Sequence, residues 1–117
     1  MLICLLSMAV HAGSKGCEIS LLVQNQKESY TENDTITVLV KVLFDQDFCD
    51  DAGKATKIFS KGLKIEKRSV WKKLSENSVG QKLVLTVLKD YKKGTITAYR
   101  KTEHYNCFKQ LDFKFGL

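Results

Sequence analysis

The fold is indicated most clearly by residues 35–44, TITVLVKVLF. The aliphatic residues of this stretch recur at every second position, as Ile36, Val38, Val40 and Val42. In an extended strand they share one face, and the intervening residues, Lys41 among them, take the other. We therefore predict a strand with one buried face, and it is the best-defined strand of the chain.

Working outward from this strand, β-branched or apolar runs predict a weaker strand at 55–59 and further strands at 82–88 and 95–100. Residues 19–23 are a short apolar run, and apolar and basic residues alternate through 63–70. Proline is absent, so Gly, Asn and Asp must supply the turns. Residues 71–77 are expected to form a turn or one helical turn, and residues 107–111 a short helix. Four or five strands with short turns predict a small all-β barrel or sandwich.

Residues 1–12, MLICLLSMAVHA, resemble a secretion signal. Val10 and Ala12 suit the small-residue positions of a cleavage site after Ala12. The run is too short to span a bilayer, which would need about 20 apolar residues. No Lys or Arg precedes the run, so we expect the true start to lie upstream. The alternative is a buried N-terminal strand or helix. We expect a secreted, extracellular protein whose residues 13–117 form one domain without a membrane span.

Three cysteines remain after residue 12, which allows one disulfide and one spare thiol. We expect Cys17 to pair with Cys107, closing a loop of about 90 residues. Cys49 would then be free or would link a second chain into a dimer. The alternative is a Cys49–Cys107 bond that leaves Cys17 spare. The sequence Asn33-Asp34-Thr35 is an N-glycosylation motif, so Asn33 is a predicted glycosylation site.

The chain has a formal net charge of +6, and its basic residues are concentrated. Between residues 54 and 73 there are eight Lys or Arg against Glu66 alone. If this stretch abuts the predicted hairpin near residues 89–101, which also contains Arg100, the two form a basic surface. The predicted polyanion-binding residues are Lys61, Lys64, Lys67, Arg68, Lys72, Lys73, Lys92 and Lys93. The alternative is a solvated face that hinders edge-to-edge aggregation.

Simple alternation along a strand would divide these residues between two faces. Lys61, Lys67 and Lys73 would share one face, and Lys64, Arg68 and Lys72 the other. In an extracellular setting the abundant polyanions are heparan sulfate chains and anionic cell surfaces, so no nucleic acid partner is expected. Lys dominates over Arg, which favours diffuse attraction over bidentate recognition.

The sequence offers no catalytic, cofactor-binding or metal-binding candidates. His104 is the one histidine after residue 12, and neither zinc-ligand spacing nor a Gly-rich phosphate loop is present. The acidic residues of the 45–53 stretch lack the spacing of an EF-hand loop and are expected to be solvated. We therefore expect a protein that is not an enzyme and needs no cofactor.

Several stretches occur in an order that resembles the netrin module (NTR domain). These are residues 33–44 (NDTITVLVKVLF), 57–62 (KIFSKG), 63–74 (LKIEKRSVWKKL), 79–87 (VGQKLVLTV), and 94–107 followed by 108–113. The resemblance implies an OB-like five-stranded β-barrel with a terminal helix, in a secreted binding module with heparin affinity. Related modules occur in netrins, in secreted frizzled-related proteins and in tissue inhibitors of metalloproteinases.

Two other functions are kept open. The first is a metalloproteinase inhibitor of the same fold, which would act through an N-terminal Cys17. The second is an immunoglobulin-like β-sandwich that serves as an immune or receptor-binding module, with Trp71 as its buried tryptophan. A Cys49–Cys107 bond would favour the sandwich, and a Cys17–Cys107 bond would oppose it.

Overall fold

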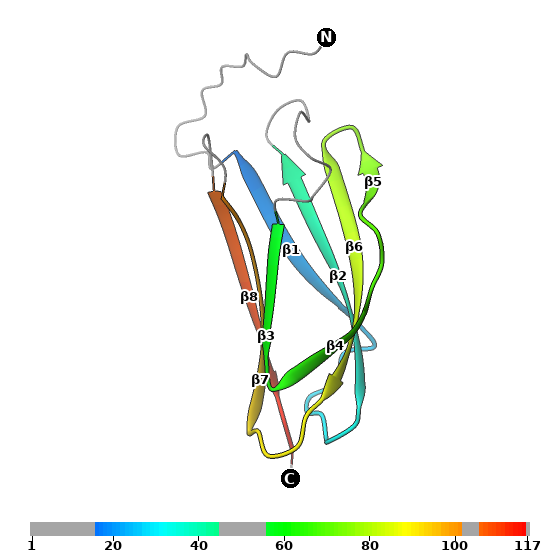
Figure 1. Ribbon diagram of the computed structural model, residues 1–117, viewed down its shortest axis with the longest axis vertical. Coiled ribbons are helices and arrows are strands. Elements are labelled where there is room, and N and C mark those ends of the chain that lie inside the picture. The colour runs from blue at the N-terminus through cyan, green and yellow to red at the C-terminus, as the bar shows by residue number, and fades with distance from the viewer. Residues whose placement is uncertain (1–15, 45–55, 102–105, 117) are drawn as a thin grey trace.

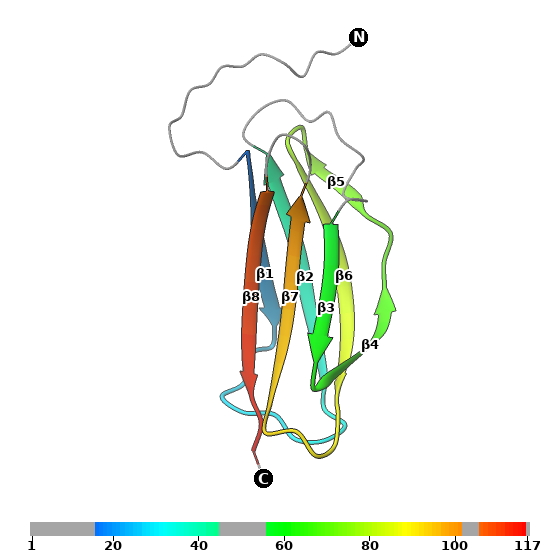
Figure 2. The ribbon, with the colours of Figure 1, turned by 60° about the vertical axis from the view of Figure 1, so that its left-hand side comes forward.

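The computed structural model describes residues 16–44, 56–101 and 106–116, which form eight strands in two antiparallel sheets. The sheets lie face to face as two layers (Figures 1 and 2). One sheet has the order β1-β2-β6-β4, with β5 also paired to β6, and the other has the order β3-β7-β8. The strands are β1 (Cys17–Gln24), β2 (Thr35–Phe44), β3 (Thr56–Lys61), β4 (Leu63–Arg68), β5 (Lys72–Ser75), β6 (Ser78–Val87), β7 (Lys93–Lys101) and β8 (Asn106–Lys114).

The expected all-β class is confirmed, but the short helix predicted at 107–111 is wrong. Neither sheet closes into a barrel, and the described residues contain no helix. Residues 107–111 lie within β8, which pairs with β7 along its whole length. A turn or one helical turn was expected at 71–77; residues 72–75 form β5 and residues 76–77 form a turn. The predicted signal segment, Cys49, His104 and the acidic 45–53 stretch lie outside the described residues.

The core lies between the two sheets and is built by period-two alternation. In β2, Ile36, Val38, Val40 and Val42 are buried, as predicted. The opposite sheet contributes Ile58, Ile96, Ala98 and Phe113 to the same apolar cluster. Because each sheet buries one face against the other, the remaining face of each sheet is left to solvent.

Between β3 and β4 the chain passes from one sheet to the other through one residue, Gly62. Strand β3 ends at Lys61 in the three-stranded sheet, and β4 begins at Leu63 in the other. Gly62 has φ +77°, and a Cβ there would lie 2.6 Å from the carbonyl oxygen of Lys93. Only glycine takes this left-handed conformation without a steric penalty. Its carbonyl accepts a hydrogen bond from the Leu88 amide at 3.0 Å, which fixes the crossing against β6.

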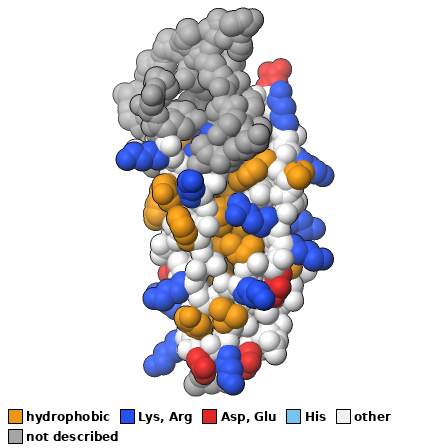
Figure 3. Space-filling view, in the orientation of Figure 1, with side chains coloured by type: hydrophobic (Ala, Val, Ile, Leu, Met, Phe, Trp, Pro, Cys, Tyr) orange, Lys and Arg blue, Asp and Glu red, His pale blue; other side chains and the backbone are white. Residues whose placement is uncertain are grey.

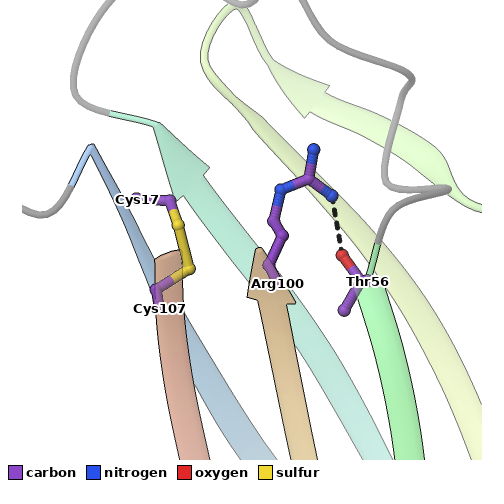
Figure 4. Close-up of a disulfide and its surroundings, with 4 residues drawn as sticks. All are labelled: Cys17, Thr56, Arg100 and Cys107. Carbon is purple, nitrogen blue, oxygen red and sulfur yellow. Dashed lines mark hydrogen bonds between the residues drawn. A yellow bond between two sulfur atoms is a disulfide. The ribbon is translucent and has the colours of Figure 1, made fainter. Parts of the chain in front are cut away.

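A disulfide joins the edge strands β1 and β8 of the two sheets (Figure 4). Cys17 and Cys107 are both buried, and their Cα atoms are 5.8 Å apart. This is the predicted pairing. It closes one side of the two-layer structure covalently, near the N-terminal end of β1.

The segment between β1 and β2 holds the other end of β8. The Tyr30 amide donates to the Lys114 carbonyl at 2.9 Å, and the Gly116 amide donates to the Tyr30 carbonyl at 2.8 Å. The buried Tyr30 ring meets Phe113 edge-on, with centroids 5.7 Å apart. The disulfide and this Tyr30 contact therefore hold β8 at both of its ends.

Arg100 is the largest side chain that is fully buried among the described residues. It follows Ile96 and Ala98 on the inward face of β7, close to the disulfide (Figure 4). Among its contacts, Nη1 donates to Thr56 Oγ1 at 2.8 Å, and its guanidinium carbon lies 5.1 Å from the centroid of the Phe44 ring. Arg100 is therefore a core residue and does not contribute to a basic surface with the hairpin.

Candidate polyanion-binding surface

Three of the predicted polyanion-binding residues lie together on the outer face of the five-stranded sheet. Lys64 and Lys67 of β4 are opposite Thr86 and Val84 of β6, and Lys72 of β5 is opposite Gly80. The even-numbered residues of β6 point away from the core, because Leu83, Leu85 and Val87 point into it. The three lysines therefore extend to the solvent on one side of β6, and all three are exposed.

A β-bulge in β4 brings Lys64 and Lys67 to the same face. The β4–β6 register shifts between Ile65 and Lys67, so that Glu66 is an extra residue in the ladder. A bulge moves every later side chain of its strand to the opposite face. The simple alternation that separated Lys64 from Lys67 is therefore wrong, and Lys72 joins both of them.

Two further lysines of this face were not predicted as binding residues. Lys82 lies in β6 opposite Leu39 of β2, and Lys41 lies in β2 opposite Gly80. The sequence signal was present, since each lysine interrupts an apolar run. We call the following five residues the basic face: Lys41, Lys64, Lys67, Lys72 and Lys82.

The remaining predicted residues lie elsewhere. Lys61 and Lys93 are on the outer face of the three-stranded sheet, and Lys92 is in the turn before β7. Lys73 is opposite the buried Val79, so its position in β5 is on the core-facing side of the sheet, at the sheet edge. Figure 3 shows how Lys and Arg side chains spread along the length of one side of the molecule, with hydrophobic side chains between them.

Arg68 also has the inward register, and it takes part in a local hydrogen-bond network. Its Nη2 donates to the Gln81 Oε1 at 3.1 Å, and Gln81 Nε2 donates to the Ser69 carbonyl at 2.8 Å. The Ser69 hydroxyl accepts from the Lys82 amide at 2.9 Å. This network fixes the path of the chain between β4 and β5, so Arg68 is a structural residue at the margin of the basic face.

Gly80 allows an apolar side chain to cover one end of the basic face, between Lys41 and Lys72. A Cβ at position 80 would lie 2.8 Å from Cδ1 of Leu74, so the Leu74 side chain occupies the space above β6. Leu74 is still 47% exposed. The basic face therefore combines separated ammonium groups with an apolar side chain at its Gly80 end.

The lysines of the basic face are not neutralised by the acidic residues that the structure describes. Where both partners are described, the ion pair found is Lys27–Asp34, with 3.0 Å between Nζ and Oδ2, in the loop before β2. The Thr31 amide and the Lys27 ammonium both donate to the Asp34 carboxylate and lower its pKa. No ion pair among the described residues involves a lysine of the basic face.

Asn33, the predicted glycosylation site, is exposed in this same loop. Its backbone has φ 72°, and its amide donates to the Val87 carbonyl at 3.0 Å. Asn is among the residues that tolerate this left-handed conformation. The side chain is thus accessible on a backbone that is held in place.

No group of three metal-ligating side chains occurs within the described strands and loops. None of the described residues belongs to a helix with the length and hydrophobicity that crossing a bilayer requires. The chain matches no family model, no curated protein sequence and no solved structure.

Proposed function

We propose that this protein is a secreted, non-enzymatic binding module that holds a sulfated glycan against the basic face. The observation that supports the proposal most is the convergence of five lysines from four strands on one sheet surface. Unpaired surface cations attract polyanions through long-range electrostatics and release condensed counterions on binding.

The dimensions of the basic face suit a linear polyanion. From Gly80 to Thr86, β6 rises by about 20 Å, and the lysines are distributed over that length. Lys41 and Lys72 flank Gly80 from the two neighbouring strands, which places their Cα atoms about 9–10 Å apart. An extended sulfated chain that runs along β6 would meet ammonium groups on both sides.

The strand orders support an immunoglobulin-like sandwich as the scaffold. Orders β1-β2-β6-β4 and β3-β7-β8 correspond to the A-B-E-D and C-F-G sheets of a constant-type domain. Two features differ from antibody domains. The disulfide joins the first and last strands, and Trp71 is half-buried before β5. The netrin-module resemblance rests on the sequence stretches alone, and the two open sheets lend no support to its barrel.

Chromatography on immobilised heparin with a salt gradient tests the proposed function. The variant K41Q/K64Q/K67Q/K72Q/K82Q removes the basic face, and it should elute at markedly lower salt than the unmodified protein. Its binding should also depend less steeply on salt concentration, because fewer counterions are released.

A matched control removes the same charge from the opposite surface. The variant K57Q/K61Q/K93Q/K101Q/K114Q has an equal change in net charge and should lose much less retention. Equal losses in the two variants would reduce the interaction to net charge and contradict a specific surface. Retention of the unmodified protein at the level of a neutral protein would contradict glycan binding altogether.

A further inference from the structure

The outer face of the three-stranded sheet exposes a group of aromatic rings. Phe59 of β3 and Phe108 of β8 are 55% and 61% exposed, and Tyr99 of β7 lies between them. The rings of Phe59 and Tyr99 are stacked, with centroids 5.9 Å apart and an interplanar angle of 17°. Tyr99 is directly opposite Phe108 in the β7–β8 ladder. We call these three residues the aromatic patch; Figure 2 shows its three strands side by side at the front.

Exposed apolar side chains that occur singly are ordinary, but a contiguous group across three strands is not. Aromatic residues are enriched at the centres of protein interfaces, where they provide a large contact area at low entropic cost. The aromatic patch therefore has the composition expected for the centre of a protein-binding surface.

The polar side chains beside the patch already bond to one another. Thr97 Oγ1 donates to Gln110 Oε1 at 3.3 Å, and Thr95 Oγ1 donates to Asp112 Oδ1 at 3.3 Å. Gln110 Nε2 donates to the same Asp112 oxygen at 3.4 Å. A sugar or a nucleobase needs several directed hydrogen bonds, which these groups would provide only by breaking their own. This arrangement favours a partner that makes apolar contacts.

The charges around the patch indicate which charge the partner should carry. By strand register the same outer face presents one acidic residue, Asp112, and five lysines: Lys57, Lys61, Lys93, Lys101 and Lys114. A second copy of the chain placed face to face would bring like charges together, which is unfavourable. Charge complementarity requires an acidic partner.

We infer that the aromatic patch binds an acidic polypeptide segment that carries aromatic side chains. The aromatic residues of the partner pack on Phe59, Tyr99 and Phe108, and its carboxylates meet the surrounding lysines. This surface belongs to the opposite sheet from the basic face, so it is independent of glycan binding.

Selection from a displayed library of random short peptides tests the inference. With the full chain as the target, the selected peptides should be rich in Asp or Glu and in Phe, Trp or Tyr. The variant F59S/F108S should bind them on the order of tenfold more weakly or worse, as expected when interface anchors are truncated. The variant K57E/K101E keeps the aromatic rings and should also lose binding of the selected peptides. This second variant keeps the test valid if F59S/F108S folds poorly.

The control variant L22S/L43S removes two exposed leucines from the other sheet, and it should retain peptide binding. Selected peptides that are neutral or basic, or that bind F59S/F108S normally, would overturn the inference. So would a dimer in sedimentation equilibrium that F59S/F108S abolishes, since the occupant would then be a second copy. Loss of heparin retention in F59S/F108S would assign the patch to a glycan and would also overturn it.

Discussion

Arg100 shows how a charged residue is accommodated in a core that is otherwise apolar. Its side chain has no exposed surface, although a guanidinium group is a cation with five N–H donors. Burial of a charge is costly unless hydrogen bonds and favourable electrostatic contacts compensate for it. Thr56 accepts one hydrogen bond, and the face of Phe44 provides a cation–π contact. The Arg100 contacts therefore make β7 dependent on specific partners in β2 and β3.

Replacement of the hydroxyl acceptor tests this dependence. Thr56→Val preserves shape and strand propensity but removes the oxygen that Arg100 Nη1 donates to. We expect the free energy of unfolding to fall by about 1–3 kcal/mol, the cost of losing a hydrogen bond to a buried charged group. Urea unfolding followed by circular dichroism measures the change.

The control is Thr97→Val, the same substitution at an outward position of β7. Because Thr97 is not buried and its hydrogen bond to Gln110 is exposed to solvent, this variant should stay within about 0.5 kcal/mol of the unmodified protein. Equal effects at the two positions would show that the Arg100–Thr56 hydrogen bond adds no specific stability.

At the level of strands, local sequence patterns predicted most of the strands but not which strands pair with each other. Strand β2 was predictable because its β-branched residues alternate strictly over ten positions. Strand β8 was not, because its apolar residues near Cys107 have a spacing that also fits a helix, and pairing with β7 determines the outcome. The same alternation that predicts β7 would have placed Arg100 inward, beside Ile96 and Ala98.

The candidate site was predictable in composition but not in arrangement. The excess of lysine in residues 54–73 is evident from the sequence, whereas the face that each lysine takes depends on the register. The bulge at Glu66 reverses that face within β4, and no local signal in the LKIEKR segment marks it. Lys41 joins the site only because β6, which is distant in sequence, pairs with β2.

The crossing at Gly62 provides a test of how β3 and β4 are connected. Gly62→Ala forces a side chain into the left-handed conformation and against the Lys93 carbonyl. The backbone penalty alone is about 1–2 kcal/mol, and the steric overlap adds to it. We expect a corresponding fall in the urea midpoint.

Gly116→Ala is the matched control, because the nearest atom to its added Cβ is the Ser29 hydroxyl at 3.2 Å. A short polar side chain can move, so stability should change by less than about 0.5 kcal/mol. A Gly62→Ala variant as stable as this control would mean that the crossing tolerates ordinary residues.

For the molecule as a whole, the largest single constraint is the bond between Cys17 and Cys107, which are separated by 90 positions. In the loop-entropy model a cross-link over this length stabilises the fold by about 4–5 kcal/mol. Domains of this size are stable by about 5–15 kcal/mol in total. The bond therefore accounts for a substantial fraction of the stability.

The variant C17A/C107A should accordingly unfold at much lower urea concentration than the oxidised protein. The unmodified protein measured in reductant should behave like the variant. A loss below about 1 kcal/mol in both would indicate that the contacts between β1 and β8 and the Tyr30 hydrogen bonds hold these strands without covalent help.

The position of this bond also determines how the domain would respond to mechanical tension. A pull applied to the chain before Cys17 and after Cys107 passes directly through the sulfur–sulfur bond. The strands between the two cysteines, from β1 to β7, then carry none of the load and cannot be drawn out. While the bond is oxidised, the segment from Cys17 to Cys107 acts as a short, inextensible link, and reduction allows the same segment to lengthen as its strands unfold.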